Sequence, residues 1–270
     1  MGVLKEIKRP VKALIKAAIY PIYEARIYSE LDFSQTPHHI GVILDGNRRW
    51  SKENPALDGD VSTIRGHKAG ADKIIDLLDW CEESQVKVLT IWLLSNQNLA
   101  RPATELEPLL EIIGETVSNL ARQKRWEIRP LGSMELLPAQ LQERLAHVAS
   151  ETKGIPGTVV NVAIGYGGRS EIADAVKALI VAGGAEGKSA TEIAANVSVD
   201  EIGRYLYTAG IPDPDLVIRT SGEQRLGGFL LWQSAHSEFY FCEAYWPDFR
   251  RIDFLRAIRA YSNRHRRFGV

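Results

Sequence analysis

The stretch HHIGVILDGNRRW, residues 38–50, decides the fold that we expect, because it joins an apolar run to a strongly polar loop. The apolar part predicts a buried β-strand over residues 39–45, and Asp45 to Arg49 would form the loop at its carboxyl end. In open parallel α/β sheets, ligands bind beyond the carboxyl ends of the strands. An Asp-Gly pair after a strand is most often only a turn, so this loop needs support from the rest of the chain.

Strand-like and helix-like segments alternate along that chain. The hydrophobic periodicity predicts strands over 39–45, 87–94, 126–131, 158–164 and 215–219, and helices over 68–84, 104–125, 138–150, 169–182, 199–207 and 252–266. Thr104 and Glu107 have the spacing of a capping box, and the Gly-rich stretch 182–189 predicts a mobile surface loop. The alternation is typical of β-α-β units, so we expect one α/β domain with a central, mostly parallel sheet flanked by helices.

Composition and charge narrow the class of protein. With 270 residues, 45% of them hydrophobic and 25% charged, the chain is ordinary for a globular domain. A formal net charge of −1 gives no basic excess, so we expect no nucleic-acid partner. Cys81 and Cys242 lie far apart and lack metal-ligand spacing, which indicates reduced core residues in a cytoplasmic protein.

The N-terminal segment, residues 1–35, is basic and amphipathic. Between residues 3 and 31, apolar side chains recur at helical spacing with basic residues mostly between them. The apolar runs are too short to span a membrane, and no signal-peptide cleavage site follows them. Two interpretations stay open: a peripheral membrane contact, for example at the inner face of the plasma membrane, or a helix packed on the protein or on a partner chain.

Four polar loops follow predicted strands, at residues 45–50, 95–102, 165–170 and 219–228. If the strands are parallel, these loops gather at one edge of the sheet around the carboxylate of Asp45. The first, second and fourth of these loops contribute five arginines, Arg48, Arg49, Arg101, Arg219 and Arg225. Arginine side chains and exposed backbone N–H groups bind phosphate oxygens, and a carboxylate among them fits a divalent metal shared with phosphate. GYGG in the third loop is only a fragment of a dinucleotide fingerprint.

The same regions resemble, in order, the motifs of the cis-prenyltransferases, the undecaprenyl diphosphate synthase family. They are DGNRRW (45–50), GHKAG (66–70), SNQNLARP (95–102), NVAIGYGGR (161–169) and DLVIRTSGEQRLGGFLLWQSAHSEFYF (215–241). The resemblance runs from about His39 to beyond Trp246. It is closest to the actinobacterial short-chain members that make Z,E-farnesyl diphosphate.

This resemblance implies an enzyme in which residues 36–270 form the catalytic domain. The implied reaction is a Mg²⁺-dependent condensation of isopentenyl diphosphate with a short allylic diphosphate, geranyl diphosphate being the expected primer, that creates a cis double bond. The family also implies a hydrophobic tunnel beside the sheet and a homodimer. The expected product is a short-chain Z-prenyl diphosphate such as Z,E-farnesyl diphosphate.

The resemblance implies roles for individual residues. At the allylic diphosphate, the metal-binding residue and its neighbours would be Asp45, Gly46, Asn47, Arg48, Arg49, Trp50, His67 and Arg101. The isopentenyl diphosphate clamp and its neighbours would be Arg219, Arg225, Leu226 and Gly227. The loop after the second strand would add Ser95, Asn96, Gln97, Asn98 and Leu99. In this loop Asn98 would serve in proton removal or orient the acceptor. Outside it, Glu238 would be a second metal-associated carboxylate, which in one interpretation reaches the site of the neighbouring subunit.

Three departures from the family pattern bear on this transfer. Gln97 stands where a carboxylate is common and Leu99 where an aromatic is common. Thr63 replaces an arginine, for which Arg65 could substitute, and Gly227 replaces a serine. These changes affect metal handling, proton handling or donor orientation, and they leave the Asp45 loop and the arginine clamp in place.

Alternatives to short-chain synthesis remain. One is a medium-chain or long-chain polyprenyl (decaprenyl or undecaprenyl) diphosphate synthase, and another is an irregular enzyme that couples two dimethylallyl units head-to-middle. A noncatalytic partner subunit is disfavoured, because such a chain would be expected to lose Asp45, the Arg219 and Arg225 clamp, or Glu238, all of which are present. The chain also lacks the D-D-x-x-D cluster of the unrelated trans-prenyltransferases.

Overall fold

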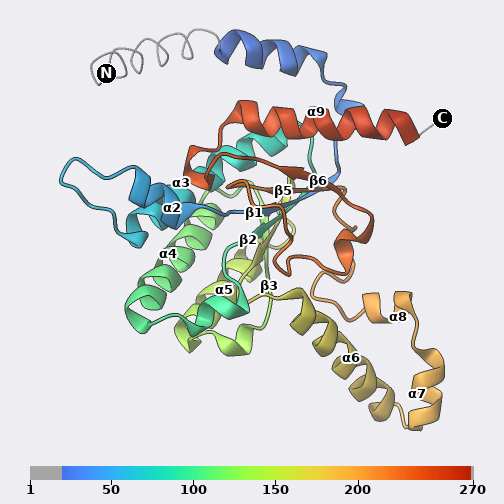
Figure 1. Ribbon diagram of the computed structural model, residues 1–270. Coiled ribbons are helices and arrows are strands. Elements are labelled where there is room, and N and C mark those ends of the chain that lie inside the picture. The colour runs from blue at the N-terminus through green and yellow to red at the C-terminus, as the bar shows by residue number, and fades with distance from the viewer. Residues whose placement is uncertain (1–19, 269–270) are drawn as a thin grey trace, which may run out of the picture.

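A six-stranded sheet forms the centre of the structure, a computed structural model that describes residues 20–268 and the side chains of residues 20–264 (Figure 1). The strands are β1 (His39–Ile43), β2 (Val88–Trp92), β3 (Glu127–Leu131), β4 (Val159–Ala163), β5 (Leu216–Arg219) and β6 (Glu238–Phe241). Their order is β3-β4-β2-β1-β5-β6, and every neighbouring pair is parallel. The expectation of one α/β domain with a parallel sheet is therefore confirmed.

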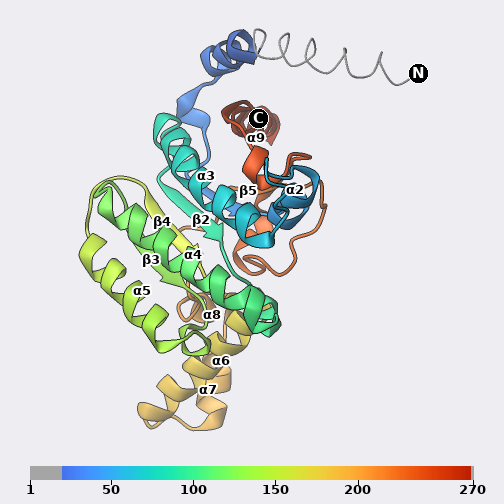
Figure 2. The same cartoon turned by 90° about the vertical axis from the view of Figure 1, so that its left-hand side faces the viewer.

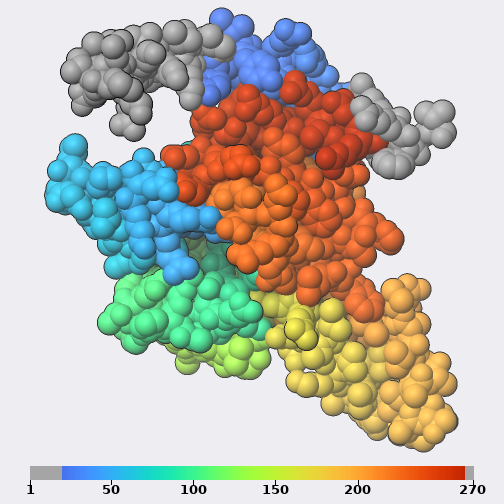
Figure 3. All heavy atoms as spheres, in the orientation of Figure 1, coloured from blue at the N-terminus to red at the C-terminus, as the bar shows by residue number. Residues whose placement is uncertain are grey.

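Helices cover the sheet and connect its strands. They are α2 (Asn47–Glu53), α3 (Thr63–Glu83), α4 (Ala103–Arg122), α5 (Ala139–Thr152), α6 (Gly168–Ala185), α7 (Ala190–Asn196), α8 (Val199–Gly203) and α9 (Arg251–Phe268). Figure 2 shows α3, α4 and α5 side by side on one face of the sheet, and Figure 3 shows α6 to α8 projecting from the body of the molecule.

Alternate residues of the strands face two separate cores. Ile40 and Val42 of β1 belong to the larger core, which includes side chains of α3, α4, α5 and α9. Ile43 of β1 and Val217 of β5 belong to a smaller core that includes Phe229. Since successive side chains of a strand point to opposite faces, both faces of the sheet are buried, as parallel sheets require.

Several predicted boundaries are wrong for local reasons. The capping box at Thr104 is absent, because α4 begins at Ala103 and no side chain caps its N-terminus. Helix α3 begins at Thr63, because the Ser62 hydroxyl accepts a hydrogen bond from the Arg65 N–H. The first half of the Gly-rich stretch 182–189 is helical, because α6 extends to Ala185, and only its second half is a loop.

The described end of the N-terminal segment packs against α9. Residues 20–30 are helical and run beside α9 in both ribbon views (Figures 1 and 2). The Arg251 guanidinium lies 4.9 Å from the Tyr28 ring centroid and bonds Glu24 at 2.7 Å. These contacts favour packing for this part, while most of the predicted amphipathic helix, residues 3–19, lies outside the described residues. Across residues 20–268 we find no helix long and apolar enough to cross a bilayer.

Four adjacent strands position the functional loops. Ile43 of β1 pairs in register with Trp92 of β2 and with Arg219 of β5, and Trp92 pairs with Ala163 of β4. The carboxyl ends of β4, β2, β1 and β5 are thus level with one another. The loops that follow these strands therefore emerge side by side, as the sequence predicts.

Candidate active site

A cavity of about 1080 Å³ opens at this edge of the sheet. The predicted residues that line it are Asp45, Gly46, Asn47, Arg48, Arg49, His67, Ser95, Gln97, Asn98, Arg101, Arg219, Arg225 and Gly227. They come from the loops after β1, β2 and β5 and from α2 and α3. Thus all five arginines singled out from the sequence meet in one cavity with Asp45.

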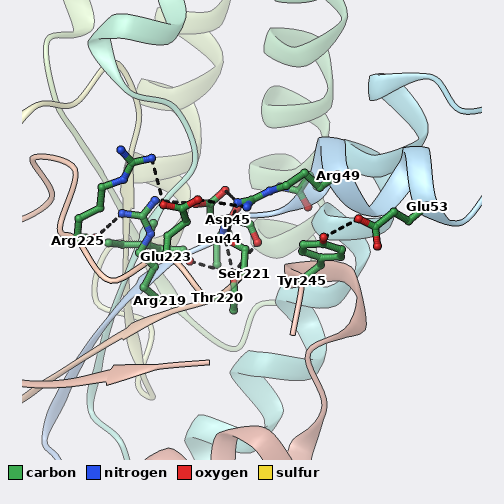
Figure 4. A network of polar contacts seen from close by, with 12 residues as sticks. Leu44, Asp45, Arg49, Glu53, Arg219, Thr220, Ser221, Glu223, Arg225 and Tyr245 are labelled. Atoms are coloured by element: carbon green, nitrogen blue, oxygen red, sulfur yellow. Dashed lines mark hydrogen bonds and ion pairs between the residues drawn. The ribbon is translucent and has the colours of Figure 1, made fainter. Parts of the chain in front are cut away.

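Asp45 is held at the start of the first loop by its own backbone and by arginines. Its N–H donates to the Thr220 hydroxyl at 2.9 Å, and that hydroxyl donates to the Asp45 carbonyl at 2.7 Å. Arg219 Nη2 donates to one carboxylate oxygen at 2.7 Å and Arg49 Nη2 to the other at 3.3 Å (Figure 4). Burial raises the pKa of Asp45, but the Arg219 hydrogen bond and the two arginine charges outweigh it, so the net pKa is lowered. Asp45 is therefore an anion at neutral pH.

A second carboxylate on these loops, that of Glu223, joins two of the arginines. It lies 3.3 Å from Arg49 Nη1 and 3.3 Å from Arg225 Nη2, and Figure 4 shows it between them. Arg49 Nη2 also donates to the Ser221 hydroxyl at 2.7 Å. Glu223 is not marked in the sequence as a site residue, because its partner Arg49 is 174 positions away.

Gly46 is required where α2 begins. Its φ of +106° lies in the left-handed region, and an added Cβ would meet Tyr245 Cδ1 at 2.7 Å and Ser221 Cβ at 3.1 Å. The Tyr245 ring also lies 5.6 Å from the Arg49 guanidinium, and its hydroxyl donates to Glu53 at 2.7 Å. Glycine thus permits the tight turn that places the α2 arginines in the cavity.

The two glycines of GHKAG bring α3 against the start of α2. An added Cβ on Gly66 would lie 2.2 Å from the Asn47 carbonyl oxygen, and one on Gly70 would lie 2.3 Å from Asn47 Oδ1. Neither position can hold a larger side chain at this separation. The close approach carries His67, which lies between the glycines, to the wall of the cavity.

His67 lies beside a second group of charged side chains, Arg48, Arg101 and Glu105, which we call the charged corner. Arg101 Nη1 is 3.1 Å and Arg48 Nη1 is 3.6 Å from Glu105 Oε1. Burial, and then the nearby charge of Arg101, lower the pKa of His67 to about 4, so its imidazole is neutral at pH 7. Glu105 was also missed from the sequence, where it reads as an ordinary residue of a helix start.

The loop after β2 is held in shape by its own side chains. The Ser95 hydroxyl accepts from the Asn98 N–H at 3.2 Å, and the Asn98 carboxamide oxygen accepts from the Ser95 N–H at 3.3 Å. Because that oxygen is already engaged and an amide is a weak base, Asn98 is better suited to orient a ligand than to accept a proton. Asn96 Nδ2 donates to the Ser170 hydroxyl at 3.0 Å, so Asn96 ties this loop to the GYGG loop.

Five predicted site residues do not line the cavity: Trp50, Asn96, Leu99, Leu226 and Glu238. Trp50 Nε1 donates to Asp248 at 2.8 Å, and its ring lies under the Arg65 guanidinium. Arg65 is therefore not placed to replace the arginine missing at Thr63, which itself lines the cavity. Glu238 starts β6, opposite Leu216 in register, and bonds Arg264 of α9 at 2.6 Å, so within one chain it lies away from Asp45.

The residues present fit a metal ion that is shared with a substrate. Within residues 20–264, no group of three or more His, Cys, Asp or Glu side chains could hold an ion by itself. Asp45 offers one partly exposed carboxylate in a cavity lined by five arginines. Mg²⁺ is commonly held by one or two carboxylates together with phosphate oxygens and water, and this donor set matches that arrangement.

A small apolar cavity of about 50 Å³ adjoins the large one. Six residues line both cavities: Leu44, Asn47, His67, Trp92, Leu93 and Leu109. The rest of its wall comes from α3, α4 and Trp246, chiefly Ile74, Ile112, Ile113 and Thr116. Since one water needs about 10–15 Å³ by this measure, the cavity has room for only a few waters. The site therefore suits a molecule with a large anionic head and a short apolar tail.

Comparison with known sequences gives consistent matches. The family model described as "Putative undecaprenyl diphosphate synthase" matches residues 43–269. A (2Z,6E)-farnesyl diphosphate synthase of Thermobifida fusca is 55% identical over 256 residues, covering 95% of this chain and 99% of that protein. A short-chain Z-isoprenyl diphosphate synthase of Mycobacterium leprae is 50% identical over 258 residues, covering 94% and 97%.

Comparison with solved structures supports the same fold. Lavandulyl diphosphate synthase from Lavandula x intermedia, in complex with dimethylallyl diphosphate, superposes with a TM-score of 0.77 at 30% identity, covering 85% of this chain and 96% of that one. A probable undecaprenyl diphosphate synthase from Campylobacter jejuni gives a TM-score of 0.67 at 26% identity, covering 87% and 99%.

Proposed function

The chain belongs to the undecaprenyl diphosphate synthase family of cis-prenyltransferases, and from this we propose that it condenses isopentenyl diphosphate with a short allylic diphosphate. Geranyl diphosphate is the expected primer, and Z,E-farnesyl diphosphate is the expected product. The observation that carries the proposal is the junction of an arginine-lined cavity with a small apolar one. The first cavity suits diphosphate groups, and the second suits a short hydrocarbon chain.

The cavity residues provide the electrostatics that this reaction needs. Cleavage of the allylic C–O bond leaves negative charge on the diphosphate, which Arg48, Arg49 and Arg101 would stabilise as it develops. Mg²⁺ bound through Asp45 would add Lewis-acid stabilisation of the same leaving group. Arg219 and Arg225 would hold the isopentenyl diphosphate so that its C4 attacks C1 of the allylic unit, and Asn98 would orient it.

Loss of the C2 proton completes the step. Asn98 is not a base, and the pKa of His67 is lowered to about 4, so the neutral imidazole is a weak acceptor at pH 7. A diphosphate oxygen of one of the substrates is the better candidate. The protein would then contribute the alignment of the C2 proton with that oxygen, through the arginines that hold both diphosphates.

Two observations support a short product over a long polyprenyl chain. The relatives that are about half identical to this chain include enzymes named for farnesyl and short-chain Z-isoprenyl products. The apolar cavity of about 50 Å³, lined by Ile112, Ile113 and Trp246, has no room for many isoprene units. A long-chain synthase would need a much deeper cavity.

Irregular coupling is a second candidate, because lavandulyl diphosphate synthase superposes with a TM-score of 0.77. The substrate pair separates the two functions. Purified protein would be given geranyl and isopentenyl diphosphates with Mg²⁺ in one reaction and dimethylallyl diphosphate alone in another. Cis-condensation predicts a C15 product only in the first reaction, whereas a branched C10 product in the second would establish irregular coupling.

Assembly, location and the metal stay predictions. A homodimer would be tested by light scattering of the full chain, and peripheral membrane binding through the N-terminal segment by sedimentation with anionic vesicles. Dependence on Mg²⁺ predicts that activity is lost with EDTA and recovered when excess Mg²⁺ is added. No nucleic-acid partner is expected, and a cytoplasmic location remains the expectation from the reduced cysteines, which are both free and buried.

A further inference from the structure

Trp92 lies where the two cavities meet. It ends β2, in register with Ile43 of β1 and Ala163 of β4, and it is the largest of the six side chains that line both cavities. In the sequence it reads as one apolar residue within the buried strand predicted over 87–94, so nothing there marks it as a site residue. Its position makes the indole a wall that the arginine-lined cavity shares with the apolar one.

Two buried aromatic rings hold this wall in place. The indole stacks on Phe229, with ring centroids 5.4 Å apart and planes 15° apart. It also meets Tyr166 edge to face, with centroids 6.3 Å apart and planes 88° apart. Phe229 and Tyr166 are both fully buried. Because neither neighbour can move aside without opening the smaller core, the indole cannot swing away to admit a larger ligand.

The indole also lies beside the arginine clamp. A Cβ added to Gly227 would lie 3.5 Å from Trp92 Cζ3 and 3.6 Å from Arg219 Nη1. The six-membered ring of Trp92 and the guanidinium of Arg219 therefore approach the same point of the 219–228 loop. A diphosphate held by Arg219 would therefore have its first carbons next to the indole.

We propose that Trp92 is the residue that limits the acceptor to a five-carbon homoallylic diphosphate, by closing the space beside Arg219 and Gly227. The inference rests on the proposed function and deepens it, since it names the residue that sets the size of the accepted isoprene unit. One misfitted methylene in an apolar pocket changes kcat/KM by about 10-fold to 200-fold. The wild-type enzyme should discriminate within that range.

The test compares isopentenyl diphosphate with 3-ethylbut-3-enyl diphosphate, which carries one more methylene on its branch. With geranyl diphosphate held constant, kcat/KM is measured for each acceptor in the wild type, Trp92→Phe and Trp92→Leu. We expect the wild type to prefer isopentenyl diphosphate at least about 10-fold. Trp92→Leu should reduce this preference at least about 10-fold. Trp92→Phe keeps a ring against Phe229, so its preference should lie between those of the wild type and Trp92→Leu.

Trp80→Phe is the matched control, because Trp80 packs on Phe249 and Phe254 of the larger core and lines neither cavity. It should leave the acceptor ratio unchanged. Trp92→Phe keeps the test informative if the leucine variant does not fold, which a melting curve would show. An unchanged ratio in the folded Trp92 variants overturns the inference, as does a change in product length without a change in that ratio. A wild type that uses neither acceptor overturns the proposed function itself, and this inference with it.

Discussion

At the scale of single residues, the site depends on carboxylates that hold arginines in place before any substrate binds. Asp45 bonds Arg219 and Arg49, Glu223 bonds Arg49 and Arg225, and Glu105 approaches Arg101 and Arg48. Five like charges in one cavity would repel one another without these partners. The carboxylates therefore preorganise the cavity for the anionic substrates that later share the arginines.

Removal of the Asp45 carboxylate tests whether that group is needed for catalysis. We expect Asp45→Ala to lower turnover at least about 100-fold, because both metal binding and the position of Arg219 are lost. Steady-state rates at saturating Mg²⁺ would measure the effect. Asp58→Asn, in the loop between α2 and α3 and outside the cavity, is the control and should behave as wild type. Near-normal Mg²⁺-dependent activity of Asp45→Ala would remove the residue from the mechanism.

Arg219→Ala should mainly weaken the binding of the acceptor, isopentenyl diphosphate. The Arg219 side chain is 8% exposed and bonds both Asp45 and the Arg225 carbonyl. Its loss therefore removes one of the two charges of the clamp and also removes a contact that holds Arg225 in place. We expect the KM for isopentenyl diphosphate to rise by about 10-fold or more, the cost of one lost charge-assisted hydrogen bond, with a smaller change for the primer. Arg129→Ala, on the opposite edge strand β3, is the control. An effect confined to the primer would mean that the two diphosphate sites are exchanged.

At the scale of elements, helix α4 contributes side chains to the walls of both cavities. Glu105 in its first turn faces the arginine-lined cavity, and Ile112, Ile113 and Thr116 further along close the apolar cavity. In the proposed function, the helix would therefore set the distance between the diphosphate and the end of the growing chain. In this account the length of the product is a property of the side chains in the middle of α4.

Ile112→Ala should lengthen the product. Ile112 is 7% exposed and lines the small cavity, so its truncation deepens the space for the hydrocarbon chain. We expect products of C20 or longer, beside C15, in chromatography of the dephosphorylated alcohols. Val117→Ala, on the same helix but outside the cavity wall, also truncates a buried branched side chain, by one carbon less, and should give C15 alone. Identical products from both variants would contradict the assignment of this cavity.

The elements also show how far sequence reasoning reaches. The buried strands and long helices were predicted, because their apolar periodicity is strong in 39–45 and 104–125. Helices α2 and α7 were missed, because Asn47–Glu53, of which Asn47 to Arg49 were predicted as loop, and Ala190–Asn196 are too short to show a helical period. Strand β6 was also missed, although Glu238–Phe241 is as long as the predicted β5. Among site residues, the loop arginines were found through the clustering of their loops. Glu105 and Trp92 were missed, because they read as ordinary residues of a helix start and of a buried strand, and Glu223 was missed because its partner Arg49 is distant in the chain.

At the scale of the whole molecule, two buried histidines should couple folding to pH. His39 in β1 lies between the Pro212 carbonyl and the Thr90 hydroxyl, and His67 lies in the charged corner. Burial first of all lowers the pKa of each to about 4. Between about pH 6.5, the ordinary histidine value, and pH 4, the unfolded chain therefore binds protons that the folded chain does not.

Stability should accordingly fall as the pH falls from about 6.5 to 4. Two such groups give a slope of about 1–3 kcal/mol per pH unit in the free energy of unfolding, measured by urea titration at pH 7, 6 and 5. His67→Gln should remove about half of that slope. His147→Gln, whose parent side chain is 78% exposed, should leave it unchanged. Asp45, whose pKa is lowered, adds a further loss only in the more acidic range where carboxylates titrate. A free energy of unfolding that does not change between pH 7 and 5 would contradict the burial of both imidazoles.

The central claim is that the arginine-lined cavity and the closed apolar cavity together make a short-chain cis-prenyltransferase. Its most direct test is incubation of the purified protein with labelled isopentenyl diphosphate, Mg²⁺ and, in separate reactions, dimethylallyl, geranyl or farnesyl diphosphate. The dephosphorylated products would be separated by chromatography, and the geometry of the new double bond determined by NMR. We expect a single C15 alcohol with a new cis bond from the geranyl primer. A ladder of long polyprenols, or no incorporation with any primer, would contradict it.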